Sequence, residues 1–234
     1  MEIIKGRQPA AWLGVVYGVP GIGKSTLAAQ APRPLFLDLE GGLTRIDCDR
    51  TPRLGTWQEL MEGMKFFFES DYQSLVIDTV DGLEEIVRRN VCELNGWKSI
   101  EAPGFGKGYA VMMERFQDFL SLCERVKAKN KNVLFIGHEV IKTHQAPDTD
   151  AYDRYNLKMN NRLAAILVGR VDFVFFAQYE AHIKSDRNND DRLRAVGTGK
   201  RILRTQEAPA WIAKNRFGLE PTTDMDASIF GKLI

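Results

Sequence analysis

Short hydrophobic runs recur along the chain of 234 residues, and segments with helical spacing separate them. Each run is nearly continuous and stops at a glycine or a polar residue, which is typical of strands buried on both faces of a sheet. We predict such strands at residues 12–17, 34–40, 74–80, 132–137 and 171–179. Further along, a turn around Asn188-Asn189 and the runs at 201–206 and 211–213 predict β structure at a sheet edge.

Helices are predicted between these strands. Thr56 and Glu59 have the spacing of a capping box, so a helix should run from there to about residue 70. A longer helix presents apolar residues on one face at alternating spacings of four and three, namely Met112, Phe116, Phe119, Cys123 and Val126. Other helices are expected at about 24–30, after the strand at 74–80 as far as about 94, and from near Lys158 onward.

This alternation predicts an α/β fold with a mostly parallel central sheet flanked by helices, and with antiparallel strands at its C-terminal edge. No repeat or linker divides the chain, so residues 1–234 are expected to form a single domain. Two segments are expected to be loops: 96–108, which is rich in glycine, and 142–156, which is mostly polar. Active sites of such sheets lie at the carboxyl ends of the strands.

Composition narrows the classes of function without selecting one. The formal net charge of +1 excludes a global basic field, so any surface that binds DNA has to be local. Three scattered cysteines (Cys48, Cys92 and Cys123) indicate buried thiols in a reducing compartment. We find no signal peptide and no apolar stretch long enough to cross a bilayer, so we expect a cytoplasmic protein that does not bind membranes.

The strongest motif follows the first predicted strand. It matches G-x-x-x-x-G-K-[ST] in full, and with the next residue it comprises Gly18, Val19, Pro20, Gly21, Ile22, Gly23, Lys24, Ser25 and Thr26. Glycines at these spacings let consecutive backbone N–H groups converge on phosphate oxygens. The lysine reaches the β- and γ-phosphates, and the serine hydroxyl is a hard ligand for Mg²⁺. The motif predicts a P-loop that binds ATP with Mg²⁺.

Asp78 ends the apolar run at 74–80 and has the form of a Walker B carboxylate, which holds the metal of a P-loop together with Ser25. An aspartate in this position can also be a helix cap. Its combination with the P-loop favours the metal ligand.

The segment Phe36-Leu-Asp-Leu-Glu40-Gly-Gly resembles the RecA-type segment that carries the catalytic glutamate. The resemblance implies a RecA-like P-loop NTPase fold and makes Glu40 the general base that activates water. A glutamate that orders the loop or the metal's surroundings is the alternative. Asp81, Glu84 and Glu85 are rival carboxylates, interpreted here as the acidic first turn of a helix.

Phe135-Ile-Gly-His138 ends a predicted strand where RecA-like proteins place a polar residue that senses the γ-phosphate. RecA itself has a glutamine there, and phage relatives have a histidine. By this resemblance His138 belongs to the catalytic set, and the segments 142–156 and 96–108 correspond in position to the DNA-binding loops. A histidine that is merely hydrogen-bonded at a strand end is the alternative.

Lys214-Asn-Arg216-Phe-Gly218 is similar to a signature of the RadA branch of RecA-like ATPases. Nearly the whole chain resembles phage-encoded RecA-like proteins that act in recombination beside a single-strand-binding protein, which would place it in the host cytoplasm. RadA's zinc finger and protease-like domain are not expected in this sequence. The resemblance implies a homo-oligomeric ring or filament in which Lys214 and Arg216 reach the γ-phosphate of a neighbouring subunit. Pairing with acidic residues of their own subunit is the alternative.

Local charge gives moderate support to single-stranded DNA as a partner. Residues 184–204 contain seven basic and three acidic residues, an excess of 7 − 3 = +4, although a solvated hairpin face explains this as well. Stacking of bases requires aromatic residues beside positive charge. The candidate DNA-binding residues in the two predicted loops and just after them are Phe105, Lys107, Arg154, Tyr155 and Lys158.

Three classes of function remain open from the sequence. The leading one is a DNA-stimulated recombination ATPase that promotes annealing or strand exchange. The second is a switch ATPase, similar to a helicase loader, whose nucleotide state controls a protein partner. The third is a small-molecule kinase, which would need an arginine lid and an acceptor pocket and would have no use for the 214–218 motif.

Overall fold

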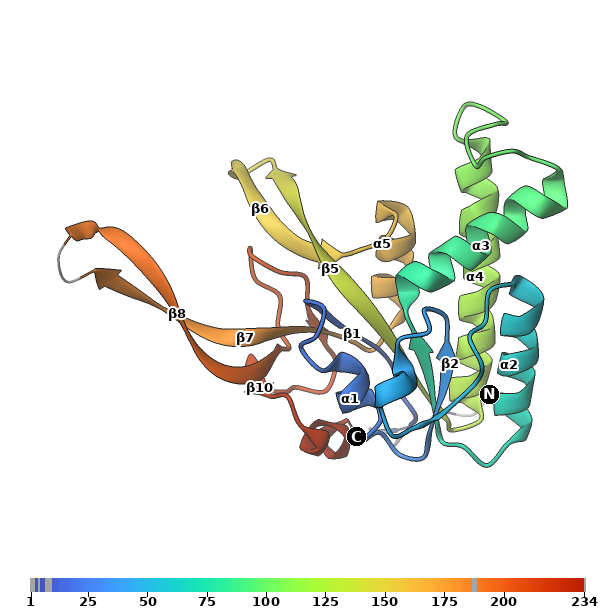
Figure 1. The fold of residues 1–234 in the computed structure, drawn as a ribbon, viewed down its shortest axis with the longest axis horizontal. Helices are drawn as coiled ribbons and strands as arrows, with labels where there is room; N and C mark the ends of the chain where they lie inside the picture. Colours follow the sequence, from blue (N-terminus) through green and yellow to red (C-terminus); the bar gives the residue numbers. More distant parts are fainter. Residues whose placement is uncertain (1–2, 4, 7–9, 187–188, 234) are drawn as a thin grey trace.

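A mixed sheet organises the protein (Figure 1). The computed structural model describes residues 3, 5–6, 10–186 and 189–233, and only the backbone of 182–186 and 189–196. Over this part, the strands are β1 (Leu13–Gly18), β2 (Pro34–Asp38), β3 (Asp49–Arg50), β4 (Ser74–Asp78), β5 (Asn132–Ala146), β6 (Thr149–Leu157), β7 (Phe173–Asp186), β8 (Asn189–Arg204), β9 (Lys214–Asn215) and β10 (Thr222–Asp224). The helices are α1 (Lys24–Ala28), α2 (Trp57–Glu69), α3 (Val80–Asn95), α4 (Lys107–Ala128) and α5 (Asn161–Arg170).

The predicted fold class is confirmed. The strand order is β10-β8-β7-β1-β5-β4-β2-β3, with β6 paired to β5 and β9 paired to β7. The pairs that join β7, β1, β5, β4, β2 and β3 are parallel, whereas β8, β9 and β10 are antiparallel to their neighbours. This is an α/β protein with a mostly parallel sheet and antiparallel C-terminal strands.

Two predicted boundaries are wrong for the same reason. Residues 142–156 were expected to form a loop, but β5 continues to Ala146 and pairs with β6 in a hairpin that projects beyond the sheet (Figure 1). Likewise, the strand expected at 211–213 is Lys214–Asn215, preceded by an isolated bridge at Trp211. In both segments the strand forms by pairing with a distant part of the chain, which local hydrophobicity does not report. The segment 96–106 is a loop as predicted, whereas residues 107 and 108 already belong to α4.

Both faces of the sheet are covered, which explains the continuous hydrophobic runs. Helices α2 to α5 bury one face, and their core includes Phe67, Phe116 and Leu167. On the other face, α1 and the C-terminal 3-10 helix Ala227–Lys232 bury the residues around Ile22 and Ile229. The capping box predicted at Thr56 is present at the start of α2. No helix among the described residues is long and apolar enough to cross a membrane.

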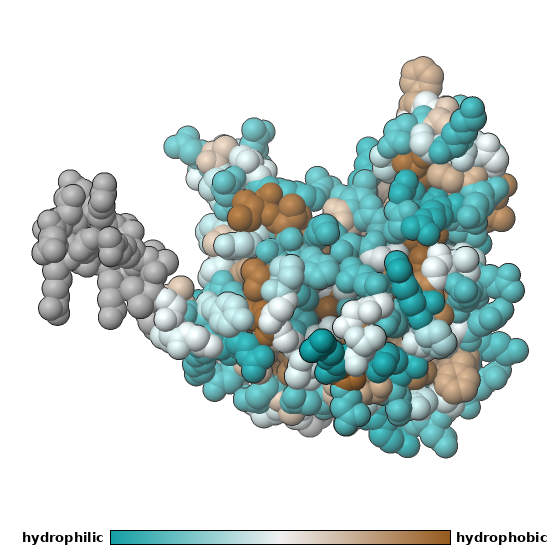
Figure 2. Space-filling model, viewed as in Figure 1, coloured by the Kyte–Doolittle hydropathy of each residue, from teal (hydrophilic) through white to brown (hydrophobic). Residues whose placement is uncertain are grey.

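The surface seen in Figure 2 is mostly hydrophilic, with hydrophobic groups exposed where the loop between α3 and α4 lies. In that loop, Phe105 is fully exposed and has a φ of 48°. Gly104 and Gly106 on either side also have positive φ values, so the loop backbone turns tightly around this ring.

Gly14 lies in β1, four residues before the P-loop, where the ring of Phe173 packs against its Cα. A Cβ atom at Gly14 would lie 2.0 Å from the nearest ring atom. We therefore expect Gly14→Ala to lower the free energy of unfolding by about 1–3 kcal/mol through overpacking. Urea denaturation measures the change, and Gly169→Ala is the control, because no atom lies within 4 Å of a Cβ there. Equal stability of the two variants would contradict the expected clash.

Candidate functional site

The P-loop connects β1 to α1 in the predicted way. Gly18 has a φ of 154°, and a Cβ there would lie 2.1 Å from the carbonyl oxygen of Ala177, so the neighbouring strand β7 excludes any side chain. Gly23 has a φ of 100° and immediately precedes Lys24, the first residue of α1. Ile22 is buried in the core beneath the loop and anchors it.

Lys24 is buried in the P-loop, with 6% of its surface exposed. Its Nζ donates to the carbonyl oxygens of Gly18 at 2.9 Å and Val19 at 3.0 Å. Burial lowers the pKa of this ammonium, against the attraction of Glu139 and Asp78. A buried cation held by carbonyl dipoles alone is suited to an anionic ligand such as a phosphate.

Ser25 follows β1 and the P-loop, and Asp78 is the last residue of β4. Because β1 and β4 are the two neighbours of β5, the two residues meet at the same end of the sheet. The Ser25 hydroxyl donates to Oδ2 of Asp78 at 2.7 Å. Burial raises the pKa of Asp78 to about 6, and the hydrogen bond from Ser25 offsets part of this rise. A buried carboxylate beside a hydroxyl is a pair of hard oxygen donors, so the two residues fit Mg²⁺ as predicted.

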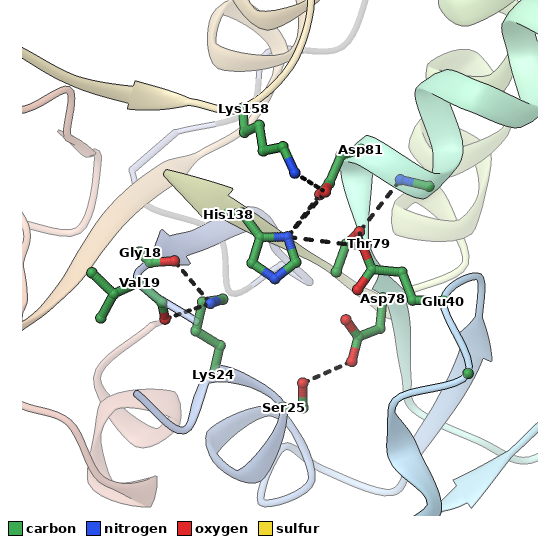
Figure 3. Close-up of polar contacts among 12 residues, drawn as sticks. Gly18, Val19, Lys24, Ser25, Glu40, Asp78, Thr79, Asp81, His138 and Lys158 are labelled. Atoms are coloured by element: carbon green, nitrogen blue, oxygen red, sulfur yellow. Dashed lines mark hydrogen bonds and ion pairs between the residues drawn. The ribbon is translucent and has the colours of Figure 1, made fainter. Parts of the chain in front are cut away.

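Glu40 follows β2 and faces the same space (Figure 3). Its Oε1 accepts a hydrogen bond of 2.7 Å from the Thr79 hydroxyl. Asp38 fixes the turn before it, because its Oδ1 accepts from the backbone N–H of Glu40 at 3.2 Å and of Gly41 at 2.6 Å. Sequence reasoning missed both Asp38 and Thr79, whose roles depend on the pairing of β2 with β4.

His138 lies opposite Gly18 in the register of β1 and β5. Its Nδ1 is 3.0 Å from Oδ2 of Asp81 and 3.8 Å from Oε1 of Glu40. Lys158 also approaches Asp81, with Nζ 3.6 Å from Oδ2. Asp81 is thus more than an acidic residue in the first turn of α3: its side chain connects β5 with the end of β6 (Figure 3). In the sequence its only signal was its position three residues after Asp78.

These groups border one cavity of about 370 Å³. The P-loop supplies Pro20, Gly21, Gly23, Lys24, Ser25 and Thr26, and the facing strand ends supply Glu40, Asp78, Thr79 and His138. Gly18, Val19 and Ile22 contribute through the loop backbone and the core. The structure therefore brings together the whole predicted nucleotide, metal and glutamate set.

Lys214 and Arg216 lie at the opposite end of the sheet. Lys214 Nζ donates to the carbonyl oxygens of Val168 and Gly169 at the end of α5, at 2.7 Å and 3.0 Å. Arg216 NH1 is 3.3 Å from Oδ1 of Asp172, which precedes β7. Both basic residues thus have partners in their own chain, and their action on a neighbouring subunit stays a prediction.

Two predicted DNA contacts are engaged within the chain. Arg154 is buried, and its NH2 donates to Glu207 at 2.6 Å and to the Trp211 carbonyl at 3.1 Å. Tyr155 stacks on Phe176 with ring centroids 4.9 Å apart. These side chains hold the C-terminal segment against the sheet. The burial of Arg154 contradicts its predicted DNA contact, whereas Tyr155 is half-buried and its contact stays a prediction. Phe105, Lys107 and Lys158 are exposed, as the prediction requires.

Only part of the basic segment 184–204 can be assessed. The side chains of Lys184, Arg187, Arg192 and Arg194 lie outside the described residues. Lys200 pairs with Asp224 at 2.6 Å, and Arg204 lies over the Trp211 ring at 4.9 Å. Arg201 NH1 donates to the Ile22 carbonyl at 3.3 Å, which is a contact with the P-loop that the sequence did not reveal.

A family model described as an AAA domain matches residues 10–217. Among solved structures, the chain is similar to a KaiC-like protein from the hyperthermophilic archaeon Pyrococcus horikoshii OT3 (13% identity, 83% of this chain, 78% of that chain, TM-score 0.40). It is also similar to the flagellar accessory protein FlaH from Methanocaldococcus jannaschii (11% identity, 92% of this chain, 84% of that chain, TM-score 0.42). No curated protein matches the chain.

The raised pKa of Asp78 gives a prediction for the protein without nucleotide or metal. A carboxyl whose folded pKa is raised to about 6 contributes stability below the unfolded pKa and loses it as pH rises through 6. Asp78→Asn removes this ionisation and can still accept from Ser25. We expect the variant to be more stable than the parent by about 1–3 kcal/mol near pH 8 and equally stable near pH 4. Urea unfolding at both pH values measures this, and a pH-independent difference would contradict it.

Proposed function

Since the chain belongs to the AAA domain family and is therefore a P-loop NTPase, we propose that it is an Mg²⁺-dependent ATPase that acts on single-stranded DNA in recombination. The observation that carries the ATPase assignment is the convergence of a buried lysine, a hydroxyl–carboxylate pair and a held glutamate around one cavity. The buried Lys24 cation accounts for binding of the phosphates of a nucleoside triphosphate. The Ser25–Asp78 pair accounts for binding of the metal ion that accompanies it. The glutamate opposite them adds a group that can activate water.

The roles follow from position and chemistry. The P-loop N–H groups and Lys24 bind the phosphates and stabilise the charge that spreads over them during transfer. Mg²⁺ held by Ser25 and Asp78 would neutralise negative charge on the phosphate oxygens. Glu40 accepts the proton of the attacking water, and the Thr79 hydroxyl holds its carboxylate toward the cavity. His138 faces the same space and donates to the terminal phosphate.

Lys24→Ala and Glu40→Gln separate binding from chemistry. The first variant should lose ATP hydrolysis, because it removes the cation buried in the P-loop. Glu40→Gln should keep ATP affinity within about twofold and lower kcat by roughly 10²–10⁴-fold, the usual contribution of a general base. Isothermal titration and steady-state turnover measure the two quantities. Glu62→Gln on α2 is the matched control, because Glu62 is exposed on the helix surface and accepts a hydrogen bond from Gln58. If Glu40→Gln hydrolyses ATP at the normal rate, Glu40 is not the general base.

Three observations support the DNA part of the proposal. Phe105 stands fully exposed in a loop with Lys107 two residues away. Segment 184–204 has an excess of basic residues in sequence. The sequence also resembles RecA-like proteins of phage recombination, and from that resemblance we infer assembly into a ring or filament and cooperation with a single-strand-binding protein. Sedimentation with and without ATP tests the assembly.

Phe105→Ala is the direct test of base stacking. We expect it to weaken binding of single-stranded DNA in the presence of ATP by roughly 1–3 kcal/mol, the usual value for one stacked base. Phe66→Ala is the matched control, since Phe66 is also an exposed phenylalanine (58%) but lies on α2. Fluorescence anisotropy at several salt concentrations measures both, and Lys107→Gln should reduce the salt dependence. If both alanine variants change the affinity for DNA equally, Phe105 does not stack on a base.

A switch ATPase with a protein partner is the second candidate, and the β5–β6 hairpin favours it. Arg154 and Tyr155 are engaged inside the molecule, whereas Asp148, Asp150 and Asp153 are exposed near the hairpin tip. An acidic tip repels DNA and suits a basic protein surface. ATP turnover that is unchanged by single-stranded DNA, with no DNA binding in ATP, would favour this second function.

A further inference from the structure

Asp81 stands directly behind the histidine that faces the nucleotide cavity. Both carboxylate oxygens lie within hydrogen-bond distance of His138 Nδ1, at 3.0 Å and 3.3 Å. Asp81 is the second residue of α3, whose start Thr79 caps through its side chain. The helix therefore fixes the position of the carboxylate, and the carboxylate in turn contacts the ring of His138.

The chemistry of this contact determines which nitrogen carries the first proton. Burial acts to raise the pKa of Asp81, but the hydrogen bond from His138 outweighs it and the pKa is lowered to about 2, so the group is ionised at neutral pH. An ionised carboxylate only accepts hydrogen bonds. Nδ1 of His138 must therefore be the donor, and it is protonated in every charge state that keeps the contact.

The other ring nitrogen is turned away from Asp81. Figure 3 shows Nε2 directed toward the space between Lys24 and Asp78. His138 lines that cavity, and its Nε2 makes no hydrogen bond to any residue in the described part of the chain. A ring held by one nitrogen thus presents the other to the site where the phosphates would lie.

We propose that Asp81 is a positioning residue for ATP hydrolysis: it orients His138 and favours its doubly protonated form, so that Nε2–H donates to the terminal phosphate. The inference rests on the proposed ATPase function and adds a residue to it. Carboxylates that accept a hydrogen bond from one nitrogen of a metal-ligating or catalytic histidine act in this way, because they fix the tautomer and the ring orientation.

The charged groups around the His138 ring determine in which direction its pKa changes when Asp81 is replaced. Asp81 on α3 and Glu40 after β2 favour the imidazolium, whereas Lys24 on α1 opposes it, and Lys158 shares the Asp81 carboxylate. The hydrogen bond to Asp81 is the largest cause of the raised pKa of His138, ahead of the opposing effect of burial. The cation is present below this raised pKa and is lost as pH rises through it. Removal of the Asp81 charge should therefore move the loss of the cation to lower pH.

A structural role for Asp81 makes a different prediction. An acidic residue in the first turn of a helix stabilises the helix through its dipole. In that case a neutral replacement would lower stability and leave the catalytic step of the folded protein unchanged. Asp81→Asn distinguishes the two roles, because the amide oxygen can still accept from Nδ1–H while the charge is lost.

The experiment is a double-mutant cycle on the full-length protein, with steady-state ATP turnover measured from acid to alkaline pH. Asp81→Asn should lower kcat roughly 10–100-fold, the range typical of residues that orient a metal-ligating histidine. The alkaline decline of kcat should also move to lower pH. In a His138→Gln background the same substitution should change kcat by less than about twofold, because the group it acts through is gone. Asp81→Glu, which keeps the carboxylate, should recover part of the activity.

Glu85→Gln is the matched control, since Glu85 lies one turn further along α3 and pairs with Arg88 and Arg89, away from the cavity. Equal effects of Asp81→Asn with and without His138, or an unshifted pH profile, would overturn the inference while leaving the ATPase assignment intact. A parent protein that does not hydrolyse ATP would instead overturn the proposed function. Thermal unfolding of each variant shows whether it is folded, and if Asp81→Asn is unstable, Asp81→Ala carries the same pH test, because it also removes the charge.

Discussion

Parallel pairing of β1, β5, β4 and β2 is the constraint on which the site depends. In this register Gly18 lies beside His138, and Asp38 lies beside Asp78. All four strands therefore end at the same edge of the sheet, where the P-loop, the metal pair and Glu40 meet. A shift of one residue would turn each of these side chains to the other face of the sheet. The hydrophobic cores on both faces oppose such a shift, because the apolar residues along these strands alternate between the two cores.

The same edge concentrates charges that are unfavourable without a ligand. Burial lowers the pKa of Lys24 and raises the pKa of Asp78, so each charged form is destabilised where it lies. A polyanion bound by Lys24 and a cation bound by Asp78 would relieve both costs together. The site is in this sense preorganised for a metal–phosphate ligand, and the stability lost in the free protein is recovered on binding.

Strand β5 connects this site to the rest of the molecule. Its parallel half ends at His138, and its second half forms the hairpin with β6. Asp81 contacts His138 on one strand of the hairpin and Lys158 just after the other. Below the hairpin, a series of aromatic ring contacts joins it to the C-terminal segment through Tyr17, Phe176, Tyr155 and Trp211. His138 and the first strand of the hairpin are thus parts of one continuous strand.

The sequence by itself determined the elements whose signal is local. Hydrophobic runs located the central strands, Thr56 and Glu59 located the start of α2, and the spacing of glycines around Lys24 identified the P-loop. These features depend on neighbouring residues, so they can be read without knowledge of the fold. Only the tertiary structure decided which polar residues meet. Asp81 and Thr79 became part of the site through the pairing of strands, and Arg154 is buried because its side chain contacts a segment far along the chain. Lys214 and Arg216 likewise have partners at the opposite end of the sheet from the cavity. Contacts between residues far apart in the chain depend on strand register and packing, so no local sequence pattern predicts them.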